Sequence, residues 1–91
     1  MTDLEQAVAD ALRLSTPAAK KILPTIQRNI NAGKAGLIRS GVSAETVAAG
    51  GELVEDCITM FCMVRMGEAS ERDYYENAFR TQQDNLRKSE D

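Results

Sequence analysis

The sequence predicts an all-α fold, a compact bundle of about four helices. Apolar residues recur every three or four positions along most of the chain, which is the period of one face of an α-helix. No segment alternates apolar and polar residues as a half-buried strand does. A chain of 91 residues has room for one core. We therefore predict one helical domain over 1–91, with helices at about 2–14, 16–40, 52–66 and 70–88.

The first predicted helix begins at a capping box. Thr2 and Glu5 have the spacing at which each side chain accepts a hydrogen bond from the backbone N–H of the other. Leu4, Val8 and Leu12 then follow at helical intervals. This segment should therefore form a helix that continues to about residue 14.

The second predicted helix, over 16–40, contains a proline near its start. Pro24 cannot donate a backbone hydrogen bond and crowds the preceding turn, so the helix should be kinked or split near this residue. Small residues at 32–36 should allow another helix to approach closely, and Gly41 is placed to end the helix in the left-handed conformation.

The second half of the chain should supply the central helix. A short helical turn and a flexible joint are predicted over 43–51, which ends in two glycines. The segment 52–66 is the most apolar of the chain and should be buried on more than one face. Gly67 should end it, and Ser70 followed by Asp73 should start the last helix.

The charges are unevenly distributed. The net charge is −3, yet every charged residue between 11 and 44 is basic, whereas acids outnumber bases from Glu45 onward. Opposite charges on different elements favour head-to-flank docking of identical chains, which closes into a ring or grows as a filament. The alternative is an ordinary solvated surface with uneven charge.

A thin core also favours self-association. Only 4% of the residues are aromatic, and small domains without disulfides or metals are often stabilised by oligomerisation. Two methionines of the central helix are candidates for contact with another chain, because thioether side chains repack easily. The predicted subunit-interface residues are Lys20, Lys21, Arg28, Lys34, Arg39, Glu52, Glu55, Asp56, Met63 and Met66.

No pattern of catalytic, cofactor-binding or metal-ligating residues is found. The chain has no histidine, its two cysteines cannot form a zinc site alone, and it has no glycine-rich phosphate loop. The acidic residues at 52–56 could form a carboxylate cluster, but they match an ordinary helix start better. We therefore expect a protein that is not an enzyme and needs no cofactor.

The cysteines and the N-terminus favour a cytoplasmic protein. Cys57 and Cys62 lie in an apolar helical stretch, as buried and reduced cysteines do. No signal-peptide pattern and no apolar run long enough to cross a membrane is found. We expect no membrane partner.

Two stretches resemble one family. The segments LPTIQRNINAGKAGLIRSGV, at 23–42, and LVEDCITMFCMVRMGEASERDYYENAF, at 53–79, resemble the head-tail connector proteins of long-tailed bacteriophages, also called adaptor or DNA packaging proteins. The resemblance implies a homo-oligomeric ring that joins the capsid portal to the tail or head-completion proteins. It further implies that DNA passes through the ring without specific binding. The protein would act in the host cytoplasm during assembly and in the virion neck.

Two other functions remain open. The basic second helix could bind DNA phosphates, which would make the chain a small DNA-binding module. Alternatively, Met63 and Met66 could form the contact surface of a helical adaptor that binds a host protein.

Overall fold

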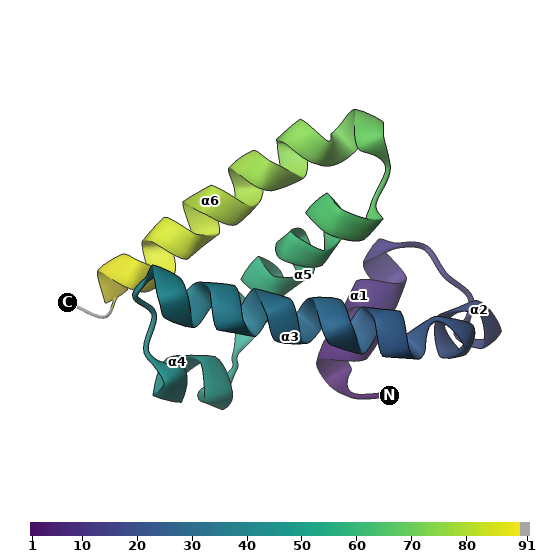
Figure 1. The fold of residues 1–91 in the computed structure, drawn as a ribbon, viewed down its shortest axis with the longest axis horizontal. Coiled ribbons are helices and arrows are strands. Elements are labelled where there is room, and N and C mark those ends of the chain that lie inside the picture. Colours follow the sequence, from purple (N-terminus) through teal and green to yellow (C-terminus); the bar gives the residue numbers. More distant parts are fainter. Residues whose placement is uncertain (90–91) are drawn as a thin grey trace.

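A computed structural model describes residues 1–89 of the chain, all of whose regular elements are helical (Figure 1). The all-α prediction is confirmed, but the count of about four helices is too low, because these residues form six α-helices and one 3-10 turn. The molecule measures 41 × 28 × 18 Å. Its elements are α1 (Asp3–Ala11), α2 (Thr16–Lys21), α3 (Leu23–Ser40), α4 (Ala44–Ala49), α5 (Glu52–Met66), η1 (Ala69–Glu71) and α6 (Arg72–Ser89).

The predicted second helix is split, not kinked. The chain leaves the helical conformation at Ile22, where φ is −109° and ψ is 15°, so α2 ends and α3 begins there. Pro24 then lies in the first turn of α3, where a missing N–H breaks no helical hydrogen bond. The break therefore falls two residues before the proline, and Ile22 forms a corner between the two helices.

The first helix is shorter than predicted because Arg13 adopts the left-handed conformation, with φ of 59°. The N–H groups of Arg13 and Leu14 bond back to the carbonyl groups of Asp10 and Ala9, at 3.0 Å each, and this closes the helix. Glycine is the usual residue at such a position, and Gly41 occupies it at the end of α3, with φ of 115°. The sequence gives no glycine signal for the end of α1.

The other predicted boundaries agree with the structure, except at the start of the last helix. The capping box is present, with Thr2 N–H donating to Glu5 Oε1 at 2.7 Å and Glu5 N–H donating to Thr2 Oγ1 at 3.1 Å. The short turn within 43–51 is α4, followed by Gly50 and Gly51, which both have positive φ. The last helix is preceded by the 3-10 turn, so it begins two residues later than predicted.

Helix α5 is the centre of the bundle, as predicted. It packs against α1, α3 and α6, and α3 crosses over α5 and α1 (Figure 1). At the crossing of α3 and α5, a Cβ atom on Gly33 would lie only 3.1 Å from Cδ1 of Phe61 and 3.5 Å from Cγ2 of Ile58. The absence of a side chain at Gly33 is what allows the two helices to approach.

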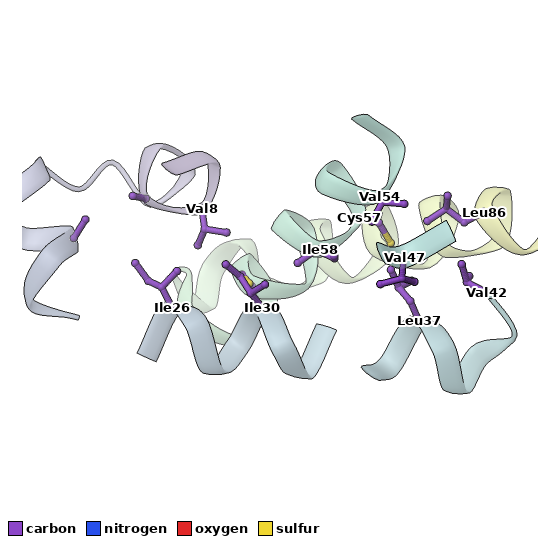
Figure 2. Close-up of a cluster of buried hydrophobic side chains, with 13 residues drawn as sticks. Val8, Ile26, Ile30, Leu37, Val42, Val47, Val54, Cys57, Ile58 and Leu86 are labelled. Carbon is purple, nitrogen blue, oxygen red and sulfur yellow. The ribbon is translucent and has the colours of Figure 1, made fainter. Parts of the chain in front are cut away.

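The core is a continuous layer between α3 and the helices behind it (Figure 2). Val8 of α1 meets Ile26 and Ile30 of α3 at one end. A second group, around Leu37, lies at the other end, and Ile58 lies between the two groups. The second group also contains Val42, Val47, Val54, Cys57 and Leu86.

Both cysteines are buried and free. Burial raises the pKa of the Cys57 thiol to about 12 and that of the Cys62 thiol to about 11, with Arg65 partly opposing the shift of Cys62. The thiolate is the reactive form, and it is scarcely populated at neutral pH.

We therefore expect alkylation by iodoacetamide to be at least about 100-fold slower in native buffer than in denaturant, because reaction requires opening of the core. Mass spectrometry over a time course measures the two rates. A Ser70→Cys variant is the control, since this exposed position should react at the rate of a free thiol. Equal rates for the native and added cysteines would contradict the expectation.

Candidate functional site

The outward face of α3 carries two of the predicted interface residues. Arg28 and Arg39 are exposed, and at about 100° per residue they lie about 200° around the helix from the buried Ile26 and Leu37, respectively. They are eleven residues apart, which places them about 16 Å apart along the same face. Between the two arginines, this face of α3 carries only small side chains, such as that of Ala35. We call this surface the outward face of α3.

Helix α5 leaves one strip uncovered, although three helices pack around it. Leu53 is 58% exposed, Asp56 is exposed, and Met60 and Val64 are half-buried. These four residues lie about 120° to 160° around the helix from Ile58, which faces α3. The strip is therefore apolar along its length and acidic at its start, where exposed Glu52 adds a second carboxylate. We call it the α5 strip.

The two surfaces point in largely opposed directions. Helix α3 crosses over α5 (Figure 1), its outward face is turned away from α5, and the α5 strip is turned away from α3. The molecule is only 18 Å thick along its shortest axis, about the depth of two packed helices. One side thus presents arginines and the other presents apolar and acidic side chains.

Two predicted interface residues of opposite charge lie in the same hollow of one chain. Lys34 and Glu55 are both half-buried and line a hollow of about 450 Å³ between α1, α3 and α5. Basic and acidic residues that are far apart in the sequence thus lie partly side by side in the folded chain. The remaining lining residues are Thr2, Asp3, Leu4, Glu5, Gln27, Ile30 and Asn31.

Glu5 connects α1 to α3 in this hollow. The backbone N–H of Thr2 donates to its carboxylate, and Nε2 of Gln27 donates to Oε2 at 2.9 Å. These hydrogen bonds hold the pKa of Glu5 below its ordinary value of 4.5. Since the folded state favours the carboxylate, Glu5 contributes stability above about pH 4.5, and this contribution is lost as the pH falls through the lowered pKa.

We expect the native chain to be more stable than a Glu5→Gln variant at neutral pH, and the difference to shrink as the pH falls from about 7 to about 3. Urea unfolding of both chains, followed by circular dichroism at each pH, measures the difference. A difference that stays constant across this range would show that the charge of Glu5 contributes nothing to folding.

An end pocket of about 240 Å³ lies where α1 and α5 end and α6 begins. Met63, one of the predicted interface residues, is only 5% exposed: it belongs to the core and to the floor of this pocket, not to an open surface of α5. Met66 is half-buried against the core. The lining residues are Ala11, Leu12, Arg13, Met63, Met66, Gly67, Glu68, Glu71 and Tyr75.

The corner between α2 and α3 projects from the same end of the molecule (Figure 1). Lys20 and Lys21 are exposed in α2, and the side chain of Ile22 at the break is 36% exposed. Two exposed lysines thus directly precede an exposed isoleucine. We call these three residues the α2–α3 corner.

The sequence patterns did not reveal that the apolar residues Ile22, Ile38 and Leu53 are exposed. Ile38 is 44% exposed although Leu37 beside it is fully buried. Neighbouring residues on a helix point about 100° apart, so only one of such a pair can face the core. The helical period itself therefore distinguishes the exposed Ile38 from the buried Leu37.

No group of three or more potential metal ligands occurs within residues 1–89. Over the same residues, no helix combines the length and the apolar character that crossing a bilayer requires. Comparison with family models, with curated proteins and with solved structures finds no match to this chain.

Proposed function

We propose that this protein is a structural subunit of a phage head-tail connector. It would form a homo-oligomeric ring that joins the capsid portal to the tail or head-completion proteins and extends the DNA channel. It would catalyse no reaction, and it would act in the host cytoplasm during assembly and in the virion neck. The resemblance of 23–42 and 53–79 to that family suggests this function. The observation that carries it is the pair of dissimilar, largely opposed surfaces on α3 and α5.

Two different, largely opposed surfaces support a ring, because the outward face of α3 of one subunit can dock on the α5 strip of the next. Arg28 and Arg39 make the outward face of α3 positive, whereas Glu52 and Asp56 make the start of the α5 strip negative. A contact between two different surfaces is heterologous, so each subunit still has one free surface for the next. Repetition closes into a ring if the rotation between neighbours allows it.

The charge of the chain is compatible with a DNA channel. A net charge of −3 gives little non-specific attraction to phosphates. In the proposed ring, the arginines of α3 are engaged by the neighbouring subunit. Acidic side chains that remain toward the channel would let DNA pass without binding.

Native mass spectrometry and chemical cross-linking test the proposal. We expect a single oligomer of ring size, either for the protein alone at high concentration or after addition of the portal protein. Finding only monomer under both conditions would contradict the proposed function.

One observation favours a second function. The shared face of Arg28 and Arg39, with the exposed lysines of α2 beyond it, could follow a DNA backbone. Binding to a random duplex should then weaken steeply with salt, and the double variant Arg28→Glu, Arg39→Glu should lose it. A native chain that does not bind at low salt excludes this function.

A further inference from the structure

We infer that the α2–α3 corner of one subunit inserts into the end pocket of the next subunit, with Ile22 entering and Lys20 and Lys21 contacting the acidic rim. This inference rests on the proposed function, because it names the surfaces through which the subunits of the ring meet. The partner is a second copy of this chain.

The pocket and the corner are complementary in character. Leu12, Met63 and Met66 give the pocket an apolar floor, and methionines adapt their shape to an entering side chain. Glu68 and Glu71 are exposed at its rim. An apolar side chain next to cations is the partner that such a pocket fits, and in the corner Ile22 directly follows two exposed lysines.

One basic residue, Arg13, partly offsets the negative charge at the rim of the pocket. Arg13 also lines the pocket and is exposed, so two carboxylates face one guanidinium. The rim still carries a net negative charge and attracts ammonium groups. No residue of α2 or α3 lines the pocket, so the corner and the pocket are separate surfaces of one chain.

The register of the two helices brings the corner and the pocket together. Helices α3 and α5 run in opposite senses across the molecule (Figure 1). In the proposed contact the neighbour's α3 lies along the α5 strip in the same opposite sense, so the start of its α3 lies near the end of α5. The corner then meets the end pocket, while Arg39 meets the start of the α5 strip.

The spacing of the charges agrees with this register. From Ile22 to Arg39 is seventeen residues, about 26 Å along a helix, and from Met66 back to Glu52 is fourteen residues, about 21 Å. These two lengths agree to within about one helical turn, so basic groups at both ends of one surface can reach acidic groups at both ends of the other.

Charge exchange tests the contact. The double variant Lys20→Glu, Lys21→Glu and the double variant Glu68→Lys, Glu71→Lys should each assemble at concentrations at least about tenfold higher than the native chain. An equimolar mixture of the two should assemble like the native chain, because every contact between unlike variants pairs opposite charges. Sedimentation velocity over a concentration series, with the portal protein present if the native chain needs it, gives the concentration of half-assembly.

A matched control reverses the same number of charges elsewhere. Arg80→Glu, Lys88→Glu changes two exposed residues of α6 that belong to neither surface, and it should assemble like the native chain. Circular dichroism confirms that each variant is folded. If the native chain forms rings and all three variants do so equally, the inference is overturned and the proposed function stands. If the native chain never assembles, with or without the portal, both are overturned.

Discussion

Replacing Ile58 by alanine should cost about 3 to 4 kcal/mol of the free energy of unfolding. Ile58 is fully buried and lies between the two groups of core residues (Figure 2). Its removal leaves a cavity between α3 and α5 that the flanking groups, already packed against other helices, cannot fill. Since small domains are typically stable by about 5 to 15 kcal/mol, the loss is a large part of the total.

Urea unfolding followed by circular dichroism measures this cost, and two comparisons calibrate it. Ile58→Val removes one methyl group and should cost about 1 kcal/mol. Leu53→Ala, on the same helix but at a position 58% exposed, should cost less than about 1 kcal/mol. Similar costs for Ile58→Ala and Leu53→Ala would mean that α5 does not hold the two groups of core residues together.

Replacing Gly33 by leucine should separate α3 from α5 and cost about 2 to 3 kcal/mol. Even a Cβ atom there lies 3.1 Å from Phe61, and the ring is held by packing against Phe79, with a centroid distance of 5.6 Å. The remaining atoms of leucine therefore have no space unless the helices move apart.

Gly36→Leu is the matched control on the same helix. A Cβ atom at Gly36 meets nothing within 4 Å, and leucine favours helix more than glycine does. This variant should gain about 0.5 kcal/mol. Thermal unfolding of both variants should move in opposite directions from the native chain. A stable Gly33→Leu would contradict the close approach of the two helices.

Local patterns determined how much of the fold the sequence could predict. The bounds of α5 match the prediction because acidic residues begin this helix and a glycine ends it, so both signals are local. The early end of α1 could not be predicted, because Arg13 takes a conformation usually left to glycine and only its hydrogen bonds back to α1 reveal it. The break at Ile22 was predicted near Pro24, since an interior proline loses a helical hydrogen bond and crowds the preceding turn.

The candidate site was harder to predict, because it depends on which helices meet. The sequence identified the charged residues and predicted Lys34 and Glu55 at a contact between subunits, whereas both line one hollow within the chain. It also predicted Met63 as a contact with another chain, although this side chain is buried. Apolar residues of a central helix are ambiguous in this respect, since the number of helices around it decides which of them are covered.

The central position of α5 also affects how the protein can fold during synthesis. Of the elements made before it, α1 and α3 pack most extensively against this helix, which begins at residue 52, whereas α2 and α4 pack against α3. While the ribosome is still translating the first half, α3 can make only its smaller contacts with α1, α2 and α4. Stable structure should therefore form only after residue 66 has left the ribosomal exit tunnel, and until then the apolar stripe of α3 is available to chaperones.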